Sequence, residues 1–240
     1  MTIMLIGLAT FASTLLGGVF ALKYKDKLHL IVGFSAGAVI GVAFFDLLPE
    51  AANLRSVSND ISTVSMMMGI GFLIYLILDR VVVLHFHSDG EDQNPLHRGT
   101  LGAASLSFHS FLDGAVIGFA FQVSAAVGAI VTAAVLTHDF SDGINTVSLV
   151  LKNQGTRRNA FWWLAIDALA PVLGITFTLF FTLPKNALGD VLAIFCGSFI
   201  YIGASELLPE SHHAHPKMLT TFMTLVGISL LYVVIQIAKM

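Results

Sequence analysis

Long apolar stretches, separated by short polar or Gly/Pro-containing turns, run through the whole chain. Each stretch can cross the hydrocarbon core of a bilayer as a helix, which requires about 20 mostly apolar residues. Because lipid offers the backbone no hydrogen-bond partners, such segments are expected to be helical. We therefore predict an all-α, polytopic membrane protein with eight transmembrane helices. The predicted spans lie near residues 3–22, 28–49, 63–84, 99–121, 124–150, 159–182, 188–209 and 218–238.

The composition indicates that lipid, and not water, is the solvent of this chain. Of its 240 residues, 56% are hydrophobic and only 11% are charged, whereas about a quarter of the residues of soluble proteins are charged. The net charge of −3 argues against a nucleic-acid partner, and the single cysteine, Cys196, excludes a disulfide framework within the chain. No soluble-sized insert separates the spans, so we expect one transmembrane domain over residues 1–240.

Basic residues are distributed unevenly between the two sides of the eight predicted spans. Only Arg55, Lys185 and Lys239 share a side with the termini. Because cytoplasmic loops carry an excess of Lys and Arg, we expect the opposite face to be cytoplasmic. The N and C termini would then be extracellular or periplasmic, in a multi-pass protein of the cell membrane. The predicted cytoplasmic face carries Lys23, Lys25, Lys27, Arg80, Arg98, Lys152, Arg157, Arg158 and Lys217.

Two segments of the chain resemble each other at an offset of 160 residues. GAVIGVAFFDLLPE (37–50) and GSFIYIGASELLPE (197–210) share the sequence LLPE, preceded in both by an acidic residue. They belong to the second and seventh spans, which cross in opposite directions. We therefore predict an inverted repeat of spans 1–3 and 6–8 around spans 4–5, an arrangement typical of alternating-access transporters. The alternative is a chance similarity between two Leu-rich helix ends that stop at proline.

Carboxylates are present within or at the ends of the spans, at depths where we expect no Lys or Arg. Ionisable residues are costly inside a bilayer and usually line pathways or pair with an opposite charge. Without basic partners, the counter-charge must be protons or a bound cation. The second span carries its two acids toward the outside, and the seventh toward the cytoplasm. The eight acids are Asp46, Glu50, Asp113, Asp139, Asp142, Asp167, Glu206 and Glu210.

The most specific motifs lie in the middle of spans four and five. HSFLDG (109–114) and HDFSDG (138–143) each contain a His and an Asp four residues apart, which places both on one helix face, with Asp139 close to it. Because the two helices run antiparallel, the His of each motif should lie level with the last Asp of the other. Imidazole with carboxylate suits Zn²⁺, Fe²⁺ or Mn²⁺, whereas Mg²⁺ and Ca²⁺ prefer oxygen ligands. A hydrogen-bonded structural pair is the alternative for either motif alone.

Other polar residues in and between the spans allow more than one interpretation. Asp167, one turn before Pro171, could support a metal ligand, carry a proton, or be an accident of helix polarity. Two histidine groups, expected in cytoplasmic loops after spans three and seven, could collect or sense metal, or be solvated loop residues. These groups are His85, His87, Asp89, Glu91, Asp92 and His97, and His212, His213 and His215.

Taken together, these motifs resemble the ZIP (Zrt/Irt-like) family of divalent metal transporters over essentially the whole chain. HSFLDG resembles the family's HNxxDG or HNxPEG signature, and HDFSDG its HExPHE or QDxPEG counterpart. LLPEA (47–51) and ELLPES (206–211) are similar to the motifs of its second and seventh spans. The chain departs from the pattern at Ser110, which replaces an Asn, and at Ala170, where some members carry a Glu.

The resemblance implies a zinc, iron or manganese importer with a binuclear site between spans four and five. It also implies an elevator-like movement of spans one, four, five and six against the other four. Carried over by position, His109, Asp113 and Asp142 would form a first metal site. Ser110, His138, Asp139 and Asp142 would surround a second, with Asp142 bridging.

From these patterns we expect a transporter and not an enzyme. It would move a divalent transition metal, with zinc first and iron, manganese or cadmium as alternatives, toward the cytoplasm by alternating access. The metal is the transported substrate, and no organic cofactor is expected. The expected partners are the metal ions and the lipid bilayer, and a homodimer is compatible with the sequence. The rivals are a zinc-dependent intramembrane hydrolase and a proton-coupled antiporter that uses the same acids.

Overall fold

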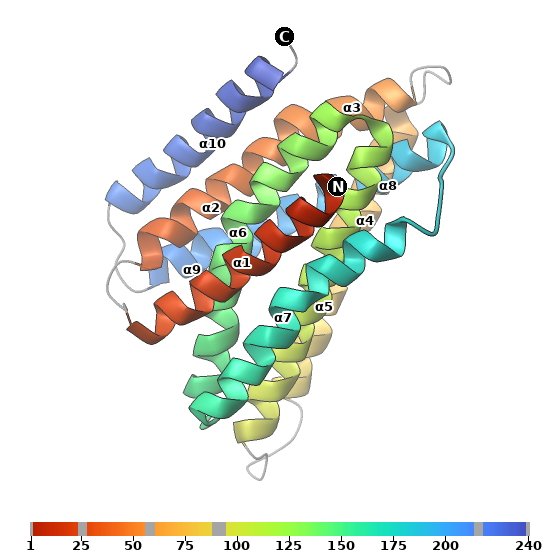
Figure 1. The fold of residues 1–240 in the computed structure, drawn as a ribbon. Helices are drawn as coiled ribbons and strands as arrows, with labels where there is room; N and C mark the ends of the chain where they lie inside the picture. Colours follow the sequence, from red (N-terminus) through yellow and green to blue (C-terminus); the bar gives the residue numbers. More distant parts are fainter. Residues whose placement is uncertain (1, 24–27, 56–60, 88–94, 214–217, 239–240) are drawn as a thin grey trace.

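The computed structural model describes residues 2–23, 28–55, 61–87, 95–213 and 218–238, and every regular element in these ranges is a helix (Figure 1). Two of the elements are short π-helical segments, η1 and η3, each set between two α-helices. The elements are α1 (Thr2–Lys23), α2 (Leu28–Val42), η1 (Ala43–Leu47), α3 (Leu48–Leu54), α4 (Ile61–His87), α5 (Pro95–Val123), α6 (Ala125–Lys152), α7 (Arg157–Thr178), α8 (Lys185–Tyr201), η3 (Ile202–Leu207), α9 (Leu208–His213) and α10 (Met218–Ala238).

Seven of the described helical segments are long and apolar enough to cross a membrane, which confirms an all-α, polytopic membrane protein. The remaining predicted span, near 124–150, coincides with α6, whose 28 residues suffice in length. His138, Asp139 and Asp142 lower the hydropathy of this helix, and it is not among the seven. The seven segments are Ile3–Leu22, Leu30–Leu54, Ile61–Leu78, Gly99–Val123, Arg157–Thr178, Lys185–Ser205 and Met218–Ile237.

Glycines let four pairs of helices pack with their backbones in contact. A Cβ atom added to either glycine of a crossing would lie only 1.9–2.2 Å from a backbone carbonyl oxygen of the partner helix. Such close approach is how helices associate in lipid, where packing and not the hydrophobic effect holds them together. The crossings are Gly17 and Gly143 for α1 with α6, Gly114 and Gly174 for α5 with α7, Gly37 and Gly227 for α2 with α10, and Gly71 and Gly197 for α4 with α8.

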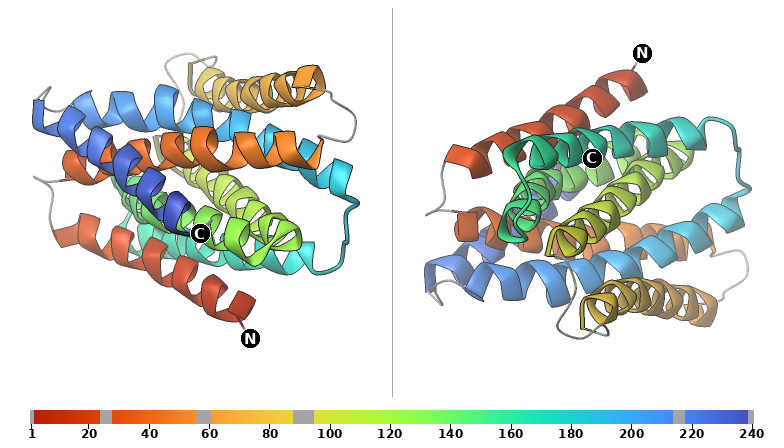
Figure 2. Two further views of the ribbon diagram at one scale, coloured as in Figure 1. Left: turned by 90° about the horizontal axis from the view of Figure 1, so that it is seen from above. Right: turned by 90° about the horizontal axis from the view of Figure 1, so that it is seen from below.

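The glycine crossings join the long helices into four pairs, and further packing of α5 on α6, of α1 on α7, and of α2 on η3 and α9 combines these pairs into two groups. Group A contains α1, α5, α6 and α7, and group B contains α2, α4, α8 and α10, with the short elements that continue α2 and α8. Figure 2 shows the groups side by side, with α6 against α2 and α5 against α8. Polar contacts join them at Ser35 on α2, whose hydroxyl donates to the carbonyl of Thr137 on α6 at 2.7 Å and lies 3.0 Å from the Ser141 hydroxyl.

The two π-helical segments occupy corresponding places in the second and seventh predicted spans. In η1 the N–H of Leu48 donates to the carbonyl of Ala43, and in η3 the N–H of Leu208 donates to that of Gly203. Each segment contains one of the predicted acids, Asp46 or Glu206, and is followed by the Pro of LLPE. π-helical turns are frequent at functional sites, and here they continue α2 into α3 and α8 into α9.

Helix boundaries correct one detail of the sequence analysis. α4 continues to His87 and α5 begins at Pro95, so His85, His87 and His97 lie in helices and not in a loop. His212 and His213 likewise belong to α9. The hydrophobic pattern predicts helices that are too short, because polar residues lie in the terminal turns of these helices.

Replacing Gly71 by Ala should destabilise the protein, because the new Cβ would meet the Ile194 carbonyl oxygen at 1.9 Å and force α4 away from α8. Overpacking of this kind costs about 1–3 kcal/mol. The matched control is Gly69→Ala on the same helix, where a Cβ meets nothing within 4 Å. Thermal unfolding of the detergent-solubilised protein compares the two variants, and equal melting temperatures would contradict the proposed packing.

Candidate metal centre

Two histidines and two aspartates meet where α5 and α6 pack against each other. His109 and Asp113 come from α5, and His138 and Asp142 from α6. All four side chains are buried, and one potential ligand atom from each lies within 4.8 Å of the others. The four-residue spacing on each helix and the antiparallel packing of the helices therefore bring together the residues that the two motifs predicted.

The distances within this four-residue cluster suit a small metal ion. Nε2 of His109 and Nε2 of His138 each lie 3.1 Å from the same oxygen, Oδ2 of Asp113. Nε2 of His109 lies 3.8 Å from Oδ2 of Asp142. Ligand atoms around one tetrahedral zinc ion are separated by roughly 3.3 Å. The observed separations bracket that value, so a small rearrangement would bring the atoms into a zinc coordination shell.

A backbone hydrogen bond orients the ring of His138. Its Nδ1 lies 3.1 Å from the carbonyl oxygen of Ala134, one turn earlier on α6. When Nδ1–H donates to that carbonyl, Nε2 carries the lone pair and points toward Asp113. Metal-binding histidines usually donate their second ring nitrogen to such a partner, which fixes both the tautomer and the ring orientation.

Asp139 is buried beside the cluster but is not one of its four members. Within the part of the chain that the structure describes, neither of its carboxylate oxygens has a hydrogen-bond partner. A buried carboxylate without hydrogen bonds is energetically unfavourable. A cation or a proton would supply the missing interaction.

Ser110 and Asp167 contact each other outside the four-residue cluster. The Ser110 hydroxyl on α5 donates to Oδ1 of Asp167 on α7 at 2.7 Å, and the Thr146 hydroxyl on α6 donates to Oδ2 at 2.8 Å. This carboxylate therefore links three helices of group A. Thr146 belongs to neither sequence motif, although it follows Asp142 by four residues and so continues the same helix face.

The remaining predicted residues belong to the second and seventh predicted spans, and those that the structure describes are not members of the four-residue cluster. Asp46 is buried in η1, and Glu50 is partly buried in α3. Glu206 lies in η3 and Glu210 in α9, and the positions of their side chains are outside the described part of the chain. The same applies to the side chains of the two histidine groups.

The fold and the cluster define a multi-pass membrane protein with a buried site that suits a divalent transition metal. Residues 96–235 match the family model described as ZIP Zinc transporter. The match covers more than half of the chain, and the chain belongs to the ZIP zinc transporter family. This confirms the family resemblance that the motifs indicated.

Curated relatives agree with this assignment. The zinc transporter ZupT of Corynebacterium aurimucosum is 28% identical over 244 residues, covering 91% of this chain and 92% of the relative. ZupT of Streptococcus mutans is 24% identical over 250 residues, covering 95% of this chain and 94% of the relative. The zinc transporter ZIP13 of Pongo abelii is 26% identical over 195 residues, covering 76% of this chain and 58% of the relative.

Replacing Asp167 by Leu should destabilise the protein, because the hydroxyls of Ser110 and Thr146 lose a buried acceptor. Each unsatisfied buried donor costs about 1–3 kcal/mol. Asp167→Asn should be much milder, because the amide oxygen accepts one bond and the amide nitrogen can donate the other. Thermal unfolding in detergent measures both variants, and a Leu variant as stable as the Asn variant would show that the hydrogen bonds contribute little.

Proposed function

We propose that this protein transports a divalent transition metal, zinc first, through the cluster of His109, Asp113, His138 and Asp142. The observation that carries the proposal is the convergence of two imidazoles and two carboxylates, all buried, on one position between two long helices. This donor set favours zinc, iron or manganese over magnesium and calcium.

Charge balance supports the same conclusion. Between Arg98 and Lys152 the sequence contains no Lys or Arg. Two ionised carboxylates of the cluster and one divalent cation sum to zero charge, whereas an empty cluster leaves two negative charges in a medium of low dielectric constant. Histidine binds the metal in its neutral form and leaves this balance unchanged.

An inverted repeat would account for the arrangement of the helices. The crossing of α1 with α6 would correspond to that of α7 with α5, and the crossing of α2 with α10 to that of α8 with α4. The glycines support this correspondence. Three pairs are separated by similar numbers of residues, which are Gly17 with Gly174, Gly37 with Gly197, and Gly71 with Gly227. The fourth pair, Gly114 with Gly143, relates the two central helices α5 and α6 to each other. The π-helical segments η1 and η3 would be a further repeated feature.

Alternating access would then be a movement of group A against group B, with α6 as the eighth span. The backbone contacts made by the paired glycines all lie within a group, whereas side chains such as Ser35 and Ser141 make the contacts between groups. Sliding the groups would therefore break few close contacts. Because α5 and α6 both belong to group A, the four-residue cluster would move as a unit.

For the second predicted metal position, Asp139 is the remaining candidate ligand. It lies beside the cluster with both oxygens available to a cation. Ser110 and Asp167 are already joined by a hydrogen bond. We therefore infer that they support the helices around the site and do not bind the metal directly.

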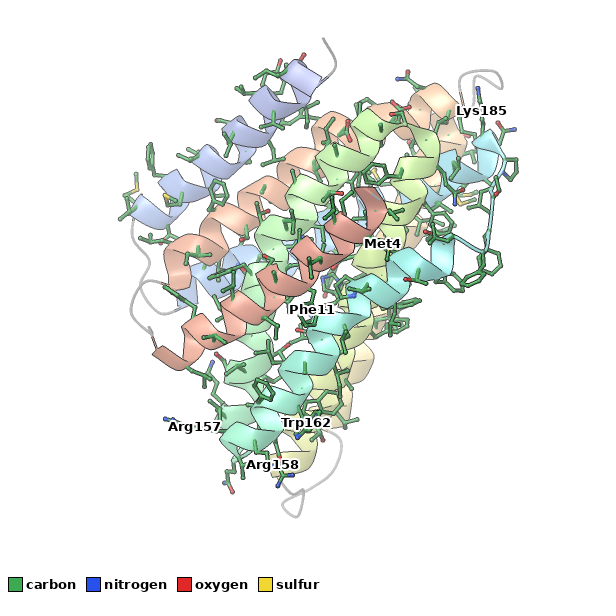
Figure 3. All side chains as sticks on the ribbon, in the orientation of Figure 1. Met4, Phe11, Arg157, Arg158, Trp162 and Lys185 are labelled. Carbon is green, nitrogen blue, oxygen red and sulfur yellow. The ribbon has the colours of Figure 1, made fainter. Side chains whose placement is uncertain are left out.

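We propose that the metal moves from Asp46 and Glu50, on the outer side, to the cluster and then toward Glu206 and Glu210. This direction requires the termini to face outward. Figure 3 shows Arg157 and Arg158 at one end of the bundle and Lys185 at the opposite end. The larger number of basic residues on the side of Arg157 supports a cytoplasmic location for that side.

Purified protein in liposomes should take up zinc saturably, and His109→Ala should reduce uptake at least roughly tenfold, because removing one of four ligands weakens the site. Leu173→Ala is the control, since Leu173 is 61% exposed on the outer surface of the bundle. Iron, manganese and cadmium are compared in the same assay. Uptake unaffected by His109→Ala would remove the site assignment, and tightly held zinc without flux would favour the intramembrane hydrolase.

The orientation can be tested in a Cys196→Ser background, which has no other cysteine. A membrane-impermeant maleimide should label Lys185→Cys in intact cells and label Arg157→Cys only after permeabilisation. Both positions are exposed and lie at opposite ends of the bundle. The reverse labelling pattern would overturn the outward orientation of the termini.

A further inference from the structure

Aromatic rings of group B contact both histidines of the metal cluster. Tyr75 on α4 packs edge-to-face against His109, with ring centroids 5.4 Å apart and an interplanar angle of 81°. Phe199 on α8 meets His138 in the same way, at 5.7 Å and 81°. Tyr75 also contacts Tyr201 of α8, with centroids 5.5 Å apart. The imidazoles belong to group A, so these contacts cross the boundary between the groups.

The two histidines differ in what orients their rings. His138 is held within group A, because its Nδ1 bonds to the Ala134 carbonyl on its own helix. For His109, the described part of the chain shows no equivalent hydrogen bond to a backbone carbonyl, and the aromatic neighbour of its ring from group B is Tyr75. His138 therefore has, besides its group B neighbour Phe199, a hydrogen bond within group A that orients its ring. Within group A, His109 has the ring of His138 and the Asp113 carboxylate beside it, so Tyr75 contributes more to its orientation.

We propose that Tyr75 is a positioning residue that makes the metal affinity of the cluster depend on the arrangement of the two helix groups. In the present arrangement its ring restricts His109 to an orientation in which Nε2 points at Asp113, 3.1 Å away. Preorganised ligands bind metal more tightly than ligands that must first be ordered. Tyr75 would thus strengthen metal binding without touching the metal.

Movement of the groups would remove this support. α4 is joined to α8 through Gly71 and Gly197, so Tyr75 stays with group B when group A moves. His109 then loses the ring of Tyr75 and gains rotational freedom, whereas His138 loses the ring of Phe199 but keeps its bond to Ala134. The site would therefore hold the ion less tightly after the movement than in the present arrangement. This inference rests on the proposed function, because it requires metal at the cluster and relative motion of the groups.

The ring of Tyr75 makes the edge-to-face contact with His109. Edge-to-face packing arises from the charge distribution of the aromatic ring. Phenylalanine at position 75 should therefore retain the effect, whereas a leucine or a methionine should lose it. Phe72, one turn earlier on α4, provides a matched control because it contacts Tyr201, with centroids 5.2 Å apart.

Cobalt(II) binding to the purified full-length protein tests the proposal, since its visible absorption reports both affinity and coordination. Tyr75→Leu should weaken cobalt binding roughly tenfold, within the range seen when support of a ligating histidine is removed. Tyr75→Phe and Phe72→Leu should bind as the wild type does. In liposomes, Tyr75→Leu should raise the KM for zinc while the maximal rate is preserved. Should Tyr75→Leu not fold, Tyr75→Met keeps the bulk without the rigid ring and carries the test.

Different outcomes separate this inference from the proposed function. Wild-type protein that does not bind cobalt, or His109→Ala that binds it as well as the wild type, overturns the metal site itself. Normal cobalt affinity in Tyr75→Leu or Tyr75→Met, with loss in His109→Ala, overturns only the role of Tyr75. A Tyr75→Phe variant as weak as the Leu variant, or an equal loss in Phe72→Leu, also overturns it, because the effect would then not come from the ring beside His109.

Discussion

The structure depends on one electrostatic constraint, which is that carboxylates buried within membrane-spanning helices need a positive counter-charge. Asp113 and Asp142 lie in a segment without Lys or Arg, between Arg98 and Lys152. Two histidines complete the cluster around them. Neutral imidazoles supply lone pairs but no charge, so a divalent cation satisfies both the charge and the coordination requirements of the site.

The close helix packing serves this constraint. Backbone contact at Gly114 ties α5 to α7, and contact at Gly143 ties α6 to α1, so both helices that carry the cluster are tied to neighbours in their own group. The ligands thus share one framework. The rings of Tyr75 and Phe199, by contrast, belong to the other group. In the proposed movement the cluster would be carried intact while its surroundings change, as alternating access requires of a metal site.

Much of this arrangement was predictable from the sequence, because the relevant signals are periodic. Apolar runs of about 20 residues predicted the helices, and the four-residue spacing of His109 with Asp113 predicted a shared face. The polar residues of α6, which complete the cluster, interrupt its apolar sequence, and this helix is not among the seven segments apolar enough to cross a membrane. The residues that form the site are therefore the same residues that weaken the hydropathy signal of this span.

Other features depend on tertiary contacts and give no periodic signal. A single Thr in an apolar helix is unremarkable in sequence, so the bond from Thr146 to Asp167 could not be foreseen. Nor does a tyrosine in an apolar helix indicate a neighbouring histidine, as Tyr75 illustrates. The π-helical segment around Asp46 likewise has no residue signature beyond the nearby proline. These contacts join segments far apart in the chain, and only the fold brings them together.

The most direct test of the central claim is an anomalous diffraction experiment at the zinc absorption edge on crystals grown with zinc. Zinc–ligand bonds to His nitrogen and Asp oxygen are about 2.0–2.2 Å long. We expect an anomalous peak at this distance from side-chain atoms of His109, Asp113, His138 and Asp142. Zinc peaks found only near the histidines at the ends of the helices, with none between α5 and α6, would contradict the claim that the four-residue cluster binds the transported metal.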